Sequence, residues 1–144
     1  DGWPMVEDPD TGQVTSHARR YMVDGLLVDQ RHHGRQGQRS HTRGPYLRWY
    51  AQDIETECRL DNDRPPDLAL RSHYHIYGDS GRDHRWSTRV IALPCLQLAT
   101  EYTHRIAAER LADVGILAIL IRGGKETLYP MIAKPARPTI VEAA

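Results

Sequence analysis

Three histidines in this chain have a spacing that suits metal binding. The stretch 71–89 holds two runs of residues on either side of Gly78-Asp79-Ser80-Gly81, a cluster that favours a tight turn. If these four residues form the loop of a β-hairpin, His75 faces His84, and His73 lies two residues before His75. Side chains two apart on a strand share a face, so His73, His75 and His84 are expected to converge on one side of the hairpin.

Three imidazoles on one sheet face predict a metal site. Neutral imidazoles suit Zn or Fe, and three of them leave a coordination position open for water or substrate. Asp79, or His104 from a neighbouring helix, is a candidate fourth ligand. A divalent metal is the one cofactor that this sequence suggests, and a metal-dependent enzyme is therefore the second functional hypothesis.

The segment Ser72-His73-Tyr74-His75-Ile76 resembles the metal-binding motif of the HUH family of single-strand nucleases and replication initiators. In that family, two histidines separated by one hydrophobic residue hold a divalent metal on a strand, and a tyrosine on a following helix attacks the DNA phosphate. Tyr102 lies on the helix predicted to follow, with Arg105 about one turn further on. The resemblance implies Tyr102 as the catalytic nucleophile of a phosphodiester cleavage.

A second candidate site is the segment 31–44, which contains four Arg, three His, three Gly and no aliphatic or aromatic residue. Such a segment cannot bury enough apolar surface to fold alone, and a loop of this length is usually functional or disordered. Arginine binds phosphate well, and a neighbouring tryptophan can stack on bases. The candidate nucleic-acid contacts are Arg31, Arg35, Arg39, Arg43, Arg48, Trp49, Arg71, Arg82, Arg85 and Arg89.

The formal net charge is zero, which argues against a uniformly basic nucleic-acid binder. The charge is unevenly distributed, since residues 31–48 are basic whereas residues 1–30 and 49–67 are acidic. Patches of opposite sign can join the subunits of a homo-oligomer. A self-assembling structural protein is therefore the third hypothesis.

The elements that must position these residues can be predicted from turn signals and periodicity. Asp24-Gly25 predicts a hairpin over 19–29. Apolar residues at helical spacing predict a helix over 45–60 and a second over 95–114, the latter opened by Pro94. Ile116–Ile121 is apolar on both faces, as in a strand buried on both sides.

These elements predict a single α+β domain over 1–144, with a mostly antiparallel sheet of four to six strands and two helices on one face. A turn-rich N-terminal arm (1–17), the Arg/His loop (31–44) and a C-terminal tail (134–144) would extend from it. An alternative interpretation is that the C-terminal half resembles a winged-helix domain. The recognition helix would then be residues 104–114, and the wing would include residues 122–125.

The leading hypothesis is a small protein that binds a DNA or RNA backbone through the Arg/His loop and the adjacent sheet face, without catalysis. The chain has two cysteines and no apolar run near the roughly 18 residues of a membrane span. A cytoplasmic protein with reduced thiols and no membrane contact is expected.

Overall fold

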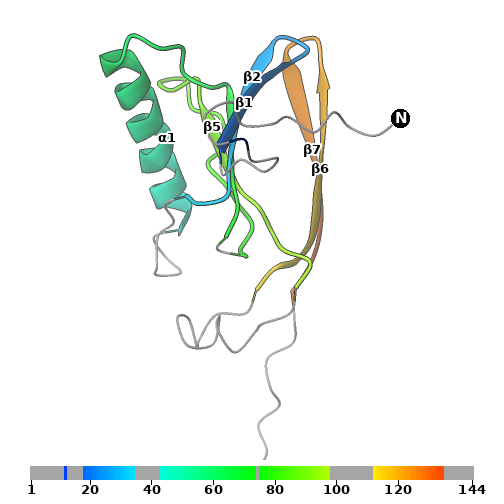
Figure 1. Ribbon diagram of the computed structural model, residues 1–144. Helices are drawn as coiled ribbons and strands as arrows, with labels where there is room; N and C mark the ends of the chain where they lie inside the picture. Colours follow the sequence, from blue (N-terminus) through cyan, green and yellow to red (C-terminus); the bar gives the residue numbers. More distant parts are fainter. Residues whose placement is uncertain (1–11, 13–17, 35–42, 74, 98–111, 135–144) are drawn as a thin grey trace, which may run out of the picture.

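One helix and two sheets form three layers in the computed structural model (Figure 1). The structure describes residues 12, 18–34, 43–73, 75–97 and 112–134. The elements in chain order are β1 (Ala18–Val23), β2 (Leu26–Arg31), α1 (Arg43–Leu60), β3 (Leu68–Arg71), β4 (Gly78–Asp79), β5 (Arg89–Ala92), β6 (Val114–Arg122) and β7 (Lys125–Ala133). Helix α1 covers one face of a five-stranded sheet, and the β6–β7 hairpin covers the other.

The central sheet has the strand order β1-β2-β3-β5-β4. Its three middle strands are parallel, and the two edge strands are antiparallel to their neighbours. Parallel neighbours need a crossover connection, which α1 supplies between β2 and β3. The register places Arg31 beside Arg71, and Arg71 beside Ala92. The carboxyl ends of all three parallel strands therefore meet at one edge of the sheet.

Hydrophobic residues fill the spaces between the layers on both sides of the central sheet. On the helix side the buried cluster consists of Leu47, Ala51, Ala69, Val90 and Ala92. On the hairpin side it consists of Val28, Leu68, Leu70 and Ile91, with Leu117, Ile119, Ile121 and Leu128 packed against it. Strand β3 is buried along its whole length because both of its faces are covered.

The predicted hairpin over 19–29 is confirmed by β1 and β2. Asp24 and Gly25 have φ values of 41° and 86°, as a two-residue turn of this kind requires. This turn also holds the β6–β7 turn, because Gly124 N donates to the carbonyl of Asp24 at 3.0 Å and Gly123 N donates to its carboxylate. The tips of the two hairpins lie side by side as a result (Figure 1).

The hairpin predicted over 71–89 is wrong. Strands β3 and β5 both lie in the central sheet but run parallel, and the two-residue β4 pairs with β5 instead. Gly78 lies opposite Ala92, so part of the predicted turn is a strand. The chain leaves β3 after Arg71, and His73 and His75 have φ values of 78° and 55°, which no strand accommodates.

The predicted second helix over 95–114 is also wrong as a continuous element. Cys95 and Val114 form a parallel bridge, and Gly115 N donates to the carbonyl of Cys95 at 2.7 Å. The ends of a 20-residue helix would lie about 30 Å apart. Residues 98–111 lie outside the described part of the chain.

These two corrections overturn the predicted fold class. The described residues contain one helix rather than two, and the five-stranded sheet is mixed rather than mostly antiparallel. The winged-helix alternative is excluded as well, because a sheet precedes β6 where that fold needs two short helices. The predicted arm, most of the Arg/His loop and nearly all of the tail lie outside the described residues.

Candidate metal centre

Three histidines meet where β2 and β3 end. His32 and His33 directly follow β2, and His73 follows β3 by two residues. Ser72 N donates to the carbonyl of Arg31 at 3.3 Å, so the two chains stay side by side beyond the last paired residues. In open sheets with parallel strands, ligands bind outside the carboxyl ends of the strands, which is where this cluster lies.

The three imidazoles are in mutual contact. The ring centroids of His33 and His73 are 4.4 Å apart, those of His32 and His33 are 4.7 Å apart, and those of His32 and His73 are 5.3 Å apart. One nitrogen from each ring can be chosen so that all three lie within 4.8 Å of one another. Nitrogens around a tetrahedral Zn ion at about 2.0–2.1 Å lie roughly 3.4 Å apart, so the rings must move closer together for all three to bind one ion.

The backbone that carries His73 is held in an uncommon conformation. His73 and His75 both have positive φ, a region that residues with a side chain rarely adopt. Such strain persists only where the surrounding structure imposes it, and it is concentrated at functional sites. The loop between β3 and β4 is therefore restrained by the structure around it.

The pKa of His73 is lowered from its ordinary value. Burial disfavours the charged imidazolium, and the neighbouring His33, His32 and His75 repel a proton further. The neutral form, which binds metals, is therefore favoured at neutral pH.

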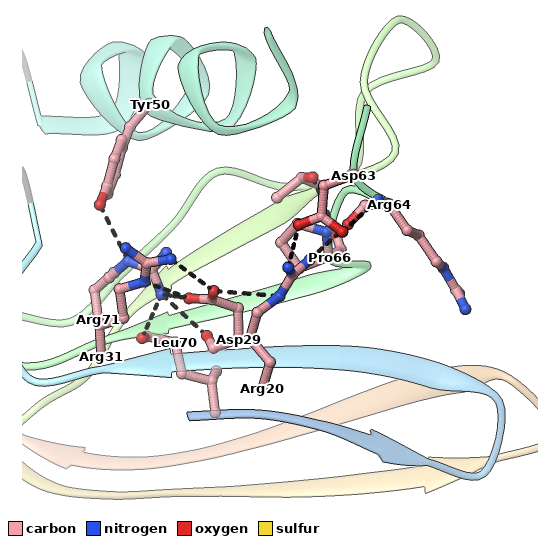
Figure 2. A network of polar contacts seen from close by, with 10 residues as sticks. Arg20, Asp29, Arg31, Tyr50, Asp63, Arg64, Pro66, Leu70 and Arg71 are labelled. Carbon is pink, nitrogen blue, oxygen red and sulfur yellow. Dashed lines mark hydrogen bonds and ion pairs between the residues drawn. The ribbon is translucent and has the colours of Figure 1, made fainter. Parts of the chain in front are cut away.

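A buried ion pair joins β2 and β3 close to their carboxyl ends (Figure 2). Arg71 Nη1 lies 2.7 Å from Asp29 Oδ1, and both side chains are almost fully buried. Arg71 also donates to the carbonyls of Asp29 and Leu70, and its Nε donates to the Tyr50 hydroxyl of α1 at 3.1 Å. One guanidinium thus joins β2, β3 and α1.

Further arginines complete the pairing of Asp29. Arg31 Nε donates to Asp29 Oδ1 at 3.1 Å, and Arg20 Nε lies 3.8 Å from Oδ2 (Figure 2). Arg20 extends the network to Asp63 and to the carbonyl of Arg64. The buried carboxylate is therefore fully compensated, as a buried charge must be.

Gly34 allows the chain after His33 to lie directly against Arg71. A Cβ atom at position 34 would lie 2.8 Å from the Cβ and Cγ atoms of Arg71. Those atoms cannot move freely, because the Arg71 guanidinium is bonded to Asp29 and Tyr50. A side chain at position 34 would therefore push the His32-His33 segment away from His73.

The structure groups the predicted metal ligands differently from the sequence. Among the described residues His73 clusters with His32 and His33, and His75 lies outside this cluster, although its charge lowers the pKa of His73. The His84 side chain is 87 % exposed and lies 3.4 Å from Asp83.

The other candidates for chemistry are elsewhere or undescribed. Asp79 pairs with Arg89. His104 and the proposed nucleophile Tyr102 lie outside the described residues. The strand that the HUH motif requires is not present, since β3 ends at Arg71, before His73.

From the sequence, His32 and His33 were expected in a phosphate-binding loop and not among the candidate metal ligands. The available signal was a His-His pair directly after one short apolar strand and a further histidine just after another. That signal becomes informative only once β2 and β3 are known to be parallel neighbours.

Most arginines predicted to bind nucleic acid form ion pairs within the chain. Those paired with a carboxylate are Arg31, Arg71, Arg82, Arg85 and Arg89. Arg48 Nε donates to the carbonyl of Ser80 at 3.2 Å, whereas Trp49 is 58 % exposed. Arg35, Arg39 and the Arg43 side chain lie outside the described part. The backbone-binding surface thus stays a prediction.

Comparison with known proteins gives little further guidance. No family model and no curated protein matches the chain. A Thermotoga maritima protein, TM1076, solved by solution NMR, aligns with a TM-score of 0.43 and 14 % identity over 81 % of this chain and 54 % of its own. Vacuolar Protein Sorting 29 from Cryptosporidium parvum aligns with a TM-score of 0.41 and 11 % identity. This alignment covers 91 % of this chain and 64 % of the other. The chain therefore spans between about half and just under two thirds of the length of these two structures.

Within the described residues, no helix combines the length and the apolar composition needed to cross a membrane.

Proposed function

We propose that this chain binds a divalent transition-metal ion through His32, His33 and His73. The observation that carries the proposal is the convergence of three imidazoles from two parallel strand ends, with a ligand atom of each within 4.8 Å of the others. Imidazole is a ligand for Zn, Cu, Fe and Ni. In the part of the chain that the structure describes, the cluster holds no carboxylate, which favours these ions over Mg or Ca, since those prefer oxygen ligands.

The surroundings support a site built for a ligand. The backbone at His73 is strained, and Gly34 gives the two strand ends a close approach. The Asp29–Arg71 pair fixes the strands directly before the histidines. Metal sites depend on such support, because ligands must be held in place before the ion arrives.

Three protein ligands leave a coordination position for water or substrate, as in catalytic rather than structural zinc sites. Metal-assisted hydrolysis is accordingly the reaction class to test, because a bound ion lowers the pKa of its water and polarises the bond that is attacked. A phosphodiester is the first substrate to try, since cleavage of this bond is the reaction that the second hypothesis from the sequence names.

Isothermal titration of the metal-free chain with Zn²⁺ tests the proposal. One ion per chain is expected, with at least a tenfold loss of affinity in His33→Ala and in His73→Ala. His84→Ala is the matched control, because its exposed side chain lies outside the cluster, and it should bind like the unchanged chain. Equal affinity in all four proteins would overturn the assignment.

A further inference from the structure

Asp113 connects the loop that carries His73 to the third layer of the fold. Its carboxylate oxygen Oδ2 accepts a hydrogen bond from Tyr77 N at 2.9 Å, and its own backbone N donates to the carbonyl of His75 at 2.8 Å. Asp113 is buried and directly precedes β6. Its carbonyl also accepts from Cys95 N at 3.1 Å. One residue therefore holds two positions of the β3–β4 loop.

His73 lies between two fixed points of that loop. On the side of β3, Ser72 N is bonded to the carbonyl of Arg31. On the side of β4, His75 and Tyr77 are bonded to Asp113. The described residues of this segment, 72, 73 and 75–77, lie in no strand, so these bonds rather than a strand ladder hold them in place. The positive φ values at His73 and His75 need such restraint, because a free loop would relax them.

We propose that Asp113 is a positioning residue for the metal site, and that it makes metal affinity depend on the docking of the β6–β7 layer. The inference rests on the proposed function. Asp113 touches neither His32 nor His33 in any bond described above; it acts through the loop backbone. Asp113 therefore affects metal binding by fixing the position of the loop that carries His73. The hydrogen bond from Tyr77 N to its carboxylate is the interaction responsible.

The coupling must act in both directions. If a docked β6–β7 layer increases the affinity for the metal, a bound metal stabilises the docked layer by the same factor. The Leu117, Ile119 and Leu128 side chains attach that layer to the central sheet. Asp113 is the polar link between this packed surface and the loop of His73.

The first experiment compares Zn²⁺ affinity in Asp113→Ala, Asp113→Asn and Glu55→Ala. Asp113→Ala removes the acceptor for Tyr77 N and should weaken binding about tenfold, as supporting residues of metal sites do. Asp113→Asn keeps an acceptor oxygen and should stay within about threefold of the unchanged chain. Glu55→Ala is the matched control, because Glu55 is also a buried carboxylate that accepts backbone N–H bonds, from Ser87 and Thr88, in a different loop.

The outcomes separate this inference from the metal site itself. If Asp113→Ala binds Zn²⁺ like the unchanged chain while His73→Ala does not, the positioning role is wrong and the site stands. If Glu55→Ala loses as much affinity as Asp113→Ala, the effect is a general loss of folding and the role is wrong. An Asp113→Asn variant as weak as Asp113→Ala would rule out the hydrogen bond to Tyr77. If the unchanged chain binds no metal, both proposals fail.

A second measurement uses the unchanged chain, so it tests the coupling between Asp113 and the metal site even if Asp113→Ala does not fold. Amide hydrogen exchange at Tyr77 reports directly on the bond to Asp113. Saturating Zn²⁺ should slow this exchange about tenfold, the same factor that coupling imposes on affinity. Unchanged exchange at Tyr77, in a chain that binds Zn²⁺ by titration, would contradict the coupling.

Discussion

Arg71 and Asp29 form a buried ion pair between neighbouring parallel strands, with Arg71 Nη1 2.7 Å from Asp29 Oδ1. The same guanidinium reaches the Tyr50 hydroxyl on α1 (Figure 2). The pair therefore fixes the crossover unit β2–α1–β3 at the edge where the three histidines gather. The stability of the fold and the geometry of the proposed metal site therefore both depend on this ion pair.

Asp29→Ala should destabilise the fold by about 3–5 kcal/mol, because it leaves the Arg71 guanidinium buried without its carboxylate. Urea unfolding followed by circular dichroism measures the loss. The matched control is Arg31→Ala. Arg31 is another partner of Asp29, but the Arg31 side chain is 51 % exposed. An exposed pair contributes about 0–1 kcal/mol, so the control should change little. Equal losses in the two variants would show that burial of the pair does not matter.

Gly34→Ala should weaken Zn²⁺ binding, because its Cβ would come within 2.8 Å of the restrained Arg71 side chain. Overpacking of this kind costs about 1–3 kcal/mol, and it displaces the segment that carries His32 and His33. Titration with Zn²⁺ and urea unfolding measure the two effects.

Gly81→Ala is the control for this glycine substitution. Its Cβ would meet no atom within 4 Å, although φ is 69°. It should lose only about 1–2 kcal/mol, from backbone strain in the left-handed region, and should keep its metal affinity. If Gly34→Ala behaves in the same way, the close approach to Arg71 has no role in the site.

The stability of the metal-free chain should decrease as the pH is lowered through the titration of His73. The pKa of this group is lowered from 6.5 in the fold, mainly by burial and by His33. Between the folded pKa and 6.5 the unfolded chain binds more protons, so stability rises with pH there and is lost as the pH falls. Urea midpoints from pH 5 to pH 7.5 should show this slope, and His73→Gln should reduce it. A NMR titration that places the His73 pKa above 6.5 would reverse the sign and contradict the prediction.

Local signals predicted the elements that form from neighbouring residues. Asp24-Gly25 gave the first hairpin, and helical spacing gave α1, because a turn and a helix are specified within a few residues of sequence. Strands β3 and β5 have only four residues each, and their direction depends on partners far along the chain. Leu68-Ala69-Leu70 and Val90-Ile91-Ala92 are continuous apolar runs, which is the composition of parallel strands covered on both faces.

The candidate site was harder to predict than the fold because it depends on that missed pairing. The predicted antiparallel hairpin places His73 on one face with His75 and His84, whereas the parallel sheet places it beside His32 and His33. The pairing error therefore changed two of the three proposed ligands. His73 is shared by both sets, although the sequence placed it within a hairpin strand and the structure places it after the end of β3.

Zn²⁺ should raise the melting temperature of the chain, and a chelator should remove the effect. An ion that binds the folded state alone stabilises it by about 2.7 kcal/mol at 100 times the dissociation constant. In a chain of this size that corresponds to a rise of roughly 5–10 °C. His73→Ala should show no rise, because one imidazole of the cluster is missing, whereas His84→Ala should behave like the unchanged chain. If Zn²⁺ still raises the melting temperature of His73→Ala, the ion binds elsewhere on the protein, because the stabilisation then does not depend on the histidines at the ends of β2 and β3.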